Sequence, residues 1–227
     1  MRWSTIATDY DGTIASDGKV DANTIDALRR ARAAGIRLLL VTGRELADLF
    51  NTFAGTDVFD LVVAENGAVI LDPATGQVRV LADPPPQTLV EALTTDNVPF
   101  SVGHSIVATV EPYDQQLVSA IAALHLPWRV IPNKGSIMAL PHGVSKGSGL
   151  LAAFTTLGLE PGQTIAIGDA ENDVEMLRLC GLGVAVNNAL PMVKAIARIT
   201  TAHDRGKGVV ELVDRVLAGE FDSDPIV

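Results

Sequence analysis

The sequence predicts an α/β fold: a Rossmann-like, mainly parallel sheet flanked by helices, with a small inserted α/β cap domain. Apolar runs alternate with helical patterns towards both ends of the chain, polar residues follow several apolar runs, and a proline-rich stretch interrupts the alternation. Strand–helix alternation implies parallel strands with helices on both faces. With 227 residues, of which 48% are hydrophobic, the chain can bury a sizeable core.

The first part of the chain carries this alternation. The expected elements are strands at 3–8, 36–41, 61–64 and 68–71 and helices at 22–34 and after Arg44. Asp21 is well placed to cap the first helix, and Gly35 follows its end. The continuous apolar run at 36–41 is typical of a strand buried in a parallel sheet. Glu65-Asn66-Gly67 is a turn signal that predicts a hairpin into the following strand.

A break in the strand–helix alternation predicts the inserted domain. Asp72-Pro73 and the run Asp83-Pro84-Pro85-Pro86 break the regular pattern, which resumes after Pro141-His142-Gly143. The elements expected in between are helices near 88–93 and 115–124 and strands near 105–110, 128–131 and 137–140. We therefore expect a cap domain at 84–141 and a core formed by 1–83 and 142–227.

The alternation then continues to the end of the chain. The expected elements are helices at 146–157, after Asn172 and at 208–217, and strands at 164–167 and 182–186. Residues 220–227 have the composition of a polar, frayed tail.

Composition argues against several classes of partner. The formal net charge is −10, from 27 acidic and 17 basic residues, and no Lys/Arg block is present. Nucleic-acid and anionic-membrane binding depend on basic patches, so neither is expected. Cys180 is the only cysteine, which excludes an intrachain disulfide and favours a reducing compartment. No apolar run approaches the ~20 residues of a membrane span, and we expect a cytoplasmic protein.

Polar residues at strand ends carry the functional signal. Apolar strands end at Asp9-Tyr10-Asp11, at Thr42-Gly43 and at Asp169, and Lys146 precedes a helix. In open parallel sheets, ligands bind outside the carboxyl ends of the strands, so these groups can converge. Clustered carboxylates repel one another, and a hard cation such as Mg²⁺ relieves the repulsion. The lysine and the threonine suit a phosphate, so the set indicates a metal-bound phosphoryl group.

The spacing of the first two carboxylates suits phosphoryl transfer. Residues two apart on a strand point to the same face, so Asp9 and Asp11 can act on one substrate. One can attack phosphorus while the other protonates the leaving oxygen and later activates water. Each motif alone has a plainer interpretation, because Asp9 and Asp11 could form a solvated turn and Thr42 or Asp169 could cap a helix. Their combination favours catalysis.

Four motifs in this order resemble the haloacid dehalogenase superfamily of phosphohydrolases. The motifs are Asp9-Tyr10-Asp11-Gly12-Thr13, Val41-Thr42-Gly43-Arg44, Lys146 and Gly168-Asp169-Ala170-Glu171-Asn172-Asp173. The resemblance implies Asp9 as nucleophile and metal ligand, and Asp11 as general acid/base whose backbone carbonyl also binds the metal. It also implies that Asp169 is a Mg²⁺ ligand and that Asp173 supports the site without binding the metal directly. The phosphate would be held by Thr42, Gly43, Lys146 and Asn172.

The place of the insert resembles one branch of that superfamily, the sugar-phosphate phosphatases with an α/β cap. This branch includes sucrose-phosphate, mannosylphosphoglycerate and archaeal phosphoglycolate phosphatases. Asn187 departs from its pattern, in which Gly is common. The candidate substrate contacts are Arg44, Asn66, His104, Arg129 and Asn188, with Asn133 and Lys134 as further polar cap residues.

Three functions remain open at this point. The first is a Mg²⁺-dependent phosphatase for a small phosphorylated metabolite, a sugar phosphate or a related organic acid phosphate. The second is a phosphomutase or phosphotransferase, which passes the same aspartyl-phosphate to another hydroxyl. The third is a non-catalytic regulator with Asp9 as phospho-acceptor, which the acid/base residue, the lysine and the cap disfavour. The oligomeric state, monomer or dimer, stays open.

Overall fold

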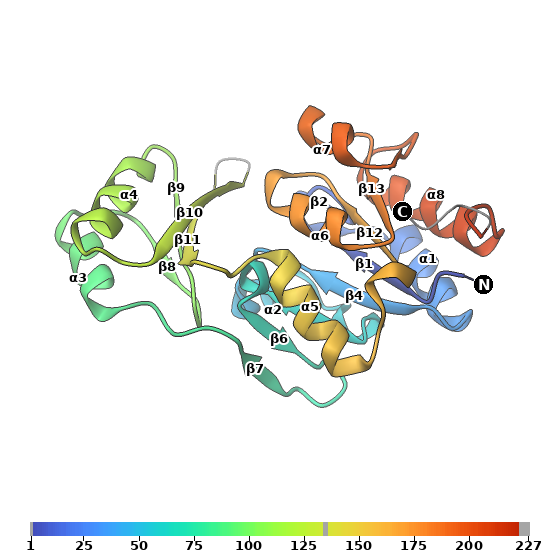
Figure 1. The fold of residues 1–227 in the computed structure, drawn as a ribbon, viewed down its shortest axis with the longest axis horizontal. Coiled ribbons are helices and arrows are strands. Elements are labelled where there is room, and N and C mark those ends of the chain that lie inside the picture. Colours follow the sequence, from blue (N-terminus) through green and yellow to red (C-terminus); the bar gives the residue numbers. More distant parts are fainter. Residues whose placement is uncertain (1, 134–135, 223–227) are drawn as a thin grey trace.

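A computed structural model describes residues 2–133 and 136–222. Within these residues, the central sheet has eight strands in the order β14-β13-β12-β1-β4-β5-β6-β7 (Figure 1). Their bounds are β1 Thr5–Thr8, β4 Arg37–Val41, β5 Leu61–Ala64, β6 Val69–Leu71, β7 Val78–Val80, β12 Thr164–Gly168, β13 Leu182–Ala185 and β14 Ile199–Thr200. The strands from β14 to β5 are parallel, and β6 and β7 are antiparallel additions at one edge. The predicted mainly parallel sheet is confirmed.

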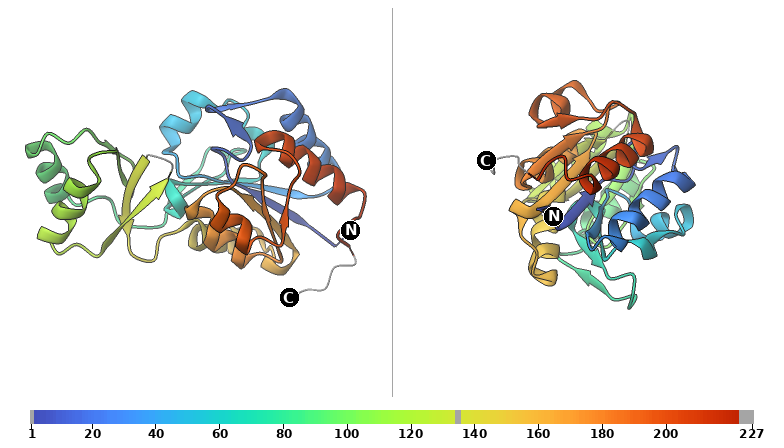
Figure 2. Two further views of the ribbon diagram at one scale, coloured as in Figure 1. Left: turned by 90° about the horizontal axis from the view of Figure 1, so that it is seen from above. Right: turned by 90° about the vertical axis from the view of Figure 1, so that its right-hand side faces the viewer.

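Helices cover both faces of this sheet (Figure 2). The core helices are α1 Ala22–Ala33, α2 Leu46–Thr52, α5 Lys146–Leu157, α6 Val174–Leu179, α7 Pro191–Ile196 and α8 Arg205–Leu217. α1 packs against α8, while α5 and α6 pack together and contact the strands β5, β12 and β13. Asp21 caps α1 as predicted, because its side chain accepts a hydrogen bond from the Thr24 N–H at 2.9 Å.

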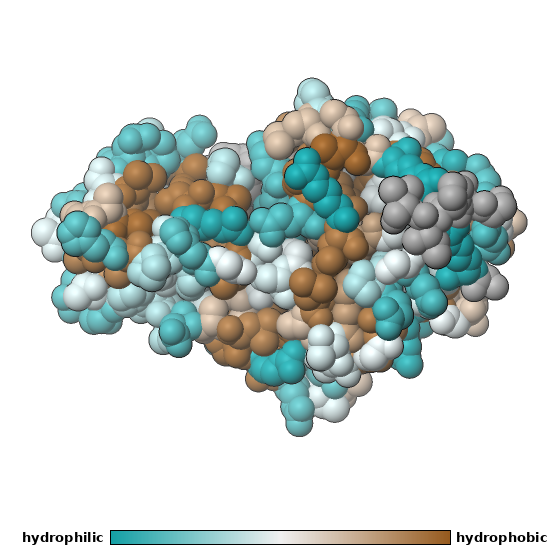
Figure 3. Space-filling model, viewed as in Figure 1, coloured by the Kyte–Doolittle hydropathy of each residue, from teal (hydrophilic) through white to brown (hydrophobic). Residues whose placement is uncertain are grey.

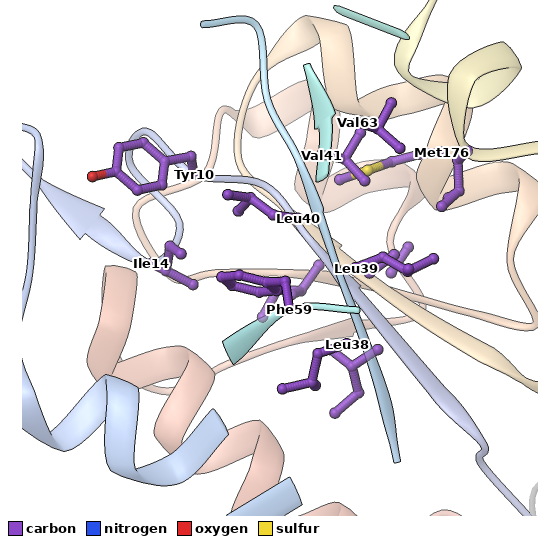
Figure 4. Packing of buried hydrophobic residues seen from close by; sticks show 14 of the residues in the cluster. Tyr10, Ile14, Leu38, Leu39, Leu40, Val41, Phe59, Val63 and Met176 are labelled. Atoms are coloured by element: carbon purple, nitrogen blue, oxygen red, sulfur yellow. The ribbon is translucent and has the colours of Figure 1, made fainter. Parts of the chain in front are cut away.

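The central position of β4 explains why its residues after Arg37 are all apolar. Leu38, Leu39, Leu40 and Val41 are all fully buried, as expected for a strand with helices on both faces. Side chains alternate, so Leu38 and Leu40 lie on the side of Tyr10, Ile14 and Phe59, and Leu39 and Val41 on that of Val63 and Met176 (Figure 4). The hydrophobic effect on both faces therefore fixes this strand in the middle of the core.

The insert forms its own sheet and its own hydrophobic cluster. Its strands lie in the order β10-β11-β9-β8, all antiparallel. The bounds are α3 Gln87–Thr95, β8 Ser101–Val102, β9 Val107–Val110, α4 Asp114–Ala123, β10 Trp128–Asn133 and β11 Ser136–Pro141. Leu89, Leu93 and Leu117 of the two helices pack with Val107 and Ala139 of the sheet. The predicted α/β cap is confirmed, and it forms a lobe beside the core (Figure 1).

The structure adds short elements that the sequence did not predict. These are the hairpin of β2 Ala15–Ser16 and β3 Lys19–Val20, the strands β7, β8 and β14, and the helix α7. Strands of two or three residues are too short to show a period-2 pattern, which explains why these strands were not predicted. β7 is an edge strand that exposes apolar side chains, with Val80 45% exposed, and an apolar area lies near it in Figure 3.

The frayed tail predicted for residues 220–227 is wrong at Phe221, near the beginning of that segment. Phe221 is only 4% exposed, and its carbonyl accepts a hydrogen bond from the Trp3 indole at 3.2 Å. One apolar residue therefore ties this segment to the core, and residues 223–227 lie outside the described part. Among the helices that are described, none is both long and apolar enough to cross a membrane.

Candidate active site

Three neighbouring parallel strands bring the predicted motifs together. β1 lies between β12 and β4, with Thr8 in register with Ile167 and Leu40. Asp9, Thr42 and Asp169 each follow directly after one of these strands, so all three lie at the same edge of the sheet. The Asp9 N–H continues the sheet pairing with a 3.0 Å hydrogen bond to the Ile167 carbonyl. The convergence expected from the sequence is therefore present.

Asp9 is in direct contact with Lys146. The Lys146 ammonium lies 2.5 Å from Asp9 Oδ1, and both side chains are almost completely buried. Lys146 is the first residue of α5, whose start is fixed by reciprocal hydrogen bonds between Ser145 and Ser148. On the other side, the Thr13 hydroxyl donates to Asp9 Oδ2 at 2.9 Å. Both oxygens of Asp9 are thus oriented by neighbours.

Asp173 holds the loop that carries Asp169. Its Oδ1 accepts from the Lys146 ammonium at 2.6 Å, and its Oδ2 accepts from the N–H groups of Asp169 and Ala170 at 2.8 and 2.9 Å. Gly168 leaves room for this carboxylate, since a Cβ there would lie 2.6 Å from Asp173 Oδ2. With both oxygens engaged, Asp173 is built to position the lysine and the loop.

The cluster carries an excess of buried negative charge. Oxygen atoms of Asp9, Asp169 and Asp173 all lie within 4.8 Å of one another, and Lys146 brings a single positive charge. Burial, together with the charges of Asp173 and Asp169, raises the pKa of Asp9 to about 8, although Lys146 opposes the shift. The two carboxylates facing Lys146 raise the pKa of its ammonium against the effect of burial. A hard cation is the group that such an oxygen cluster would accept.

Four further predicted residues lie beside the cluster. Thr42 is fully buried, and its hydroxyl oxygen accepts from the Arg44 N–H at 3.1 Å. Asn172 donates to Asn66 Oδ1 at 2.9 Å, while its own Oδ1 is buried and has no partner among the described residues. A buried polar atom of this kind is typical of a position that meets a bound group. Gly43 packs against Asn66, since a Cβ there would lie 3.2 Å from Asn66 Nδ2.

Asn188 lies at the edge of the carboxylate cluster, next to Asp169 and Gly12. Its Nδ2 lies 2.8 Å from the Gly12 carbonyl and 3.4 Å from Asp169 Oδ2. Its Oδ1 accepts from the Arg205 N–H at 2.7 Å. Arg205 itself has a positive φ of 50°, and we predicted no role for it from the sequence. Asn188 therefore links the Asp169 loop to the turn after Asp11.

A cleft of about 800 Å³ separates this edge of the core from the cap. The core side includes Asp11, Gly43, Arg44, Glu45 and Arg205, and the cap side includes Phe100, Ser101, Ala108, Val110, Ser136 and Met138. The Ser101 hydroxyl donates across the cleft to Glu45 Oε1 at 2.6 Å. The cap sheet therefore faces this edge of the core mainly with small, apolar and hydroxyl side chains.

The two cap residues singled out from the sequence lie where cap and core join. His104 Nδ1 is 2.8 Å from Glu65 Oε1. Arg129 donates to the Val144 carbonyl at 2.6 Å and lies 3.5 Å from Glu175. Neither belongs to the described residues that line the cleft. Asn133 is the last residue of β10, and Lys134 lies outside the described residues.

Glu65 is a junction residue that we did not predict from the sequence. It is fully buried at the end of β5, and its carboxylate accepts from the N–H groups of His104 and Ser105 at 3.0 and 2.9 Å. Gly103 is required beside it, because a Cβ there would lie 2.6 Å from Glu65 Oε2. The rule that functional polar residues follow the ends of strands would have identified Glu65, because it comes directly after β5. Glu65 ties the cap to the core.

Replacing Glu65 with glutamine is expected to destabilise the protein by about 1–3 kcal/mol. The substitution turns one acceptor oxygen into an NH₂ group that faces cap N–H donors, so buried donors lose their partner. Urea unfolding would measure the loss, with the exposed Glu91→Gln on α3 as control. Equal free energies of unfolding for the two variants would contradict the role given to Glu65.

Comparisons with known proteins agree with this geometry. The family model for haloacid dehalogenase-like hydrolases matches residues 6–111 and 104–213. The chain is 32% identical over 223 residues to phosphoglycolate phosphatase 2 of Saccharolobus solfataricus, covering 95% of this chain and 93% of that protein. It is 31% identical over 228 residues to a phosphoglycolate phosphatase of Methanoculleus marisnigri, covering 93% and 95%.

A solved structure supports the fold at lower sequence identity. The crystal structure of a haloacid dehalogenase-like hydrolase from Bacteroides thetaiotaomicron superposes with a TM-score of 0.79 at 20% identity, covering 94% of this chain and 99% of that one. The family model spans most of the chain, and its matched ranges contain the four motifs that form the cluster. This chain belongs to the haloacid dehalogenase-like hydrolase family.

Proposed function

We propose that the chain is a magnesium-dependent phosphatase that hydrolyses a small phosphorylated metabolite through an aspartyl-phosphate on Asp9. It is an enzyme of the phosphatase class, as its family and its relatives named phosphoglycolate phosphatases indicate. The observation that carries the proposed mechanism is the buried contact of Asp9 with Lys146, inside one cluster with Asp169 and Asp173.

Two steps account for the reaction. In the first, an Asp9 oxygen forms a bond to phosphorus, the bond from phosphorus to the leaving oxygen breaks, and Asp11 gives that oxygen a proton. In the second, Asp11 takes a proton from water, the water oxygen attacks phosphorus, and the bond to Asp9 breaks. Lys146 balances the negative charge around the phosphoryl group, and the Thr42 hydroxyl supplies a hydrogen-bond donor.

The donor set suits Mg²⁺. We assign the Asp9 and Asp169 carboxylates and the Asp11 backbone carbonyl as its ligands, with Asp173 supporting them. When bound, the ion would neutralise charge on the transferring phosphoryl group. The assignment is supported by the chemistry of the residues present: buried oxygens lie close together, with one lysine to offset them.

Magnesium is expected to stabilise the fold more at about pH 9 than at about pH 6. The folded-state pKa of Asp9, about 8, lies above its ordinary 3.8, so the folded chain retains a proton that the unfolded chain releases. Without a cation, the stability from this group is complete below about pH 4 and lost as pH rises through 8. Mg²⁺ takes the place of that proton, so its binding strengthens as the proton leaves.

Thermal unfolding with and without MgCl₂ at both pH values tests this expectation. Asp169→Asn is the matched variant, because it removes one proposed ligand and should shrink the magnesium-dependent rise in Tm. A rise that is equal at the two pH values, or that persists in full in Asp169→Asn, would contradict the assignment.

The cleft favours a small substrate with a polar leaving group. We propose residues 84–141 as the cap that closes the leaving-group side and 1–83 with 142–227 as the core. Hydroxyl groups of Ser101 and Ser136 on the cap side would suit a sugar phosphate or a related organic acid phosphate. The proposed setting is the cytoplasm, supported by Cys180 as the chain's only cysteine.

Release of inorganic phosphate from a panel of phosphorylated sugars and organic acids tests the function. We expect hydrolysis that requires Mg²⁺ and stops with a chelator. Transfer of the phosphoryl group to an added alcohol, without free phosphate, would instead establish a phosphotransferase. Full activity in the presence of a chelator would overturn the magnesium assignment.

A further inference from the structure

Arg44 is the cation nearest to the acid/base candidate in the cleft, and its surroundings fix its place. Its guanidinium lies 2.7 Å from Asp48 Oδ2 and 3.1 Å from the Thr52 hydroxyl. Its central carbon lies 5.2 Å from the centre of the Tyr10 ring. These neighbours hold the planar group at the wall of the cleft, where the Arg44 side chain is only 20% exposed.

The remaining contacts of Arg44 take up both oxygens of Asp11. Nε donates to Asp11 Oδ2 at 2.7 Å, and Nη2 donates to Asp11 Oδ1 at 2.8 Å. Two parallel hydrogen bonds fix the plane of a carboxylate as well as its position. Within the described residues, these two are the side-chain hydrogen bonds of Asp11. Its orientation beside the Gly12 turn therefore depends on Arg44.

Arg44 has little capacity left for a substrate anion. A guanidinium has five N–H donors, and four hydrogen bonds are in place, two to Asp11 and one each to Asp48 and Thr52. Binding a phosphate or carboxylate in the paired mode needs two free N–H groups. A direct role in substrate binding, as expected from the sequence, would require Arg44 to release Asp11 or Asp48.

We propose that Arg44 is a positioning residue, which aims the Asp11 carboxyl group at the leaving oxygen. This inference rests on the proposed phosphatase function. In the first step a proton moves from Asp11 to the leaving oxygen as the bond from that oxygen to phosphorus breaks. A leaving group that is stable as an anion needs this proton little, whereas an alkoxide needs it fully. The importance of Arg44 should therefore rise with the basicity of the leaving group.

Two probes with different leaving groups test the proposal. For Arg44→Met, which keeps an apolar stem against Tyr10, we expect kcat/KM for glycerol 2-phosphate to fall by about 10²–10³-fold. For 4-nitrophenyl phosphate the fall should stay below about tenfold, because proton transfer contributes little there. Arg44→Lys should recover only part of the loss, since an ammonium makes one contact where the guanidinium makes two.

A double-mutant cycle separates positioning from substrate binding. Adding Arg44→Met to Asp11→Asn should lower kcat/KM for glycerol 2-phosphate no further, because both changes disable one proton transfer. Arg30→Met is the control, since it removes another arginine–aspartate pair, Arg30 with Asp214 at 2.6 Å, between α1 and α8. This control should match the wild type on both probes, and near-native melting of each variant would establish that it folds.

Two results would overturn the role given to Arg44. One is an equal loss on both probes with a raised KM, which would make Arg44 a phosphate-binding residue. The other is a further, additive loss in the double variant. If the wild-type chain hydrolysed neither probe in the presence of Mg²⁺, the proposed phosphatase function would be overturned, and this inference with it. That outcome differs from the two results above, in both of which the wild type is active.

Discussion

Replacing Asp9 with asparagine is expected to lower the phosphatase rate by about 10⁴-fold or more, because the nucleophile is lost. The amide has nearly the shape of the carboxylate, so its oxygen can still accept from Lys146, while its NH₂ group can donate to the hydroxyl oxygen of Thr13. The fold should also tolerate the change well. Burial and the nearby carboxylates raise the pKa of Asp9, which means that its negative charge is unfavourable in the metal-free protein.

Activity and stability should therefore separate in Asp9→Asn. Phosphate release measures the activity. Thermal unfolding in the presence of a chelator measures the stability, at about pH 9, where the wild-type carboxylate is ionised. We expect a Tm equal to or above that of the wild type. Asp72→Asn, at a partly exposed position in the turn before β7, is the matched control for both measurements. Activity within tenfold of the wild type would show that another group attacks phosphorus.

Replacing Lys146 with methionine is expected to impair both stability and catalysis. The ammonium is 1% exposed and bridges Asp9 and Asp173, so its removal leaves two buried carboxylates without their cation. Breaking a buried pair in this way typically costs about 3–5 kcal/mol. The same ammonium is aimed at the site of phosphoryl transfer, and its loss should lower kcat/KM by about 10²–10³-fold.

Lys207→Met provides the control for this variant. Lys207 is an exposed residue of α8, so the same substitution there should leave the free energy of unfolding and kcat/KM near their wild-type values. Urea unfolding and phosphate release on both variants make the comparison. If Lys146→Met were as stable as Lys207→Met, the buried ion pairs would not hold the cluster together.

The core and the convergence of the candidate site residues could be predicted from the sequence because each depends on strong local patterns. Leu38–Val41 has no polar residue, which fits a strand covered on both faces, and the structure buries all four side chains. Lys146 begins the helix expected at 146–157, and Asp9 and Asp169 follow adjacent strands. The rule that parallel strands present their carboxyl ends at one edge then brings distant residues together.

The contacts between cap and core could not be predicted in this way. His104 and Arg129 were chosen because they flank strands, yet they meet Glu65 and the Val144 carbonyl at the junction. These contacts depend on how the cap sheet is placed against the core sheet, and no periodic pattern encodes that placement. The pairing of Arg44 with Asp11 is likewise a tertiary contact between residues 33 positions apart.

Identification of the phosphorylated residue tests the central claim most directly. The Asp11→Asn variant, which should hydrolyse its phosphoenzyme slowly, would be mixed with 4-nitrophenyl phosphate and Mg²⁺, quenched in acid and treated with borohydride. Borohydride reduces an acyl-phosphate to an alcohol, so peptide mass spectrometry should find homoserine at position 9. Nitrophenol release without any modified residue, or homoserine at Asp169 or Asp173 instead, would contradict Asp9 as the nucleophile.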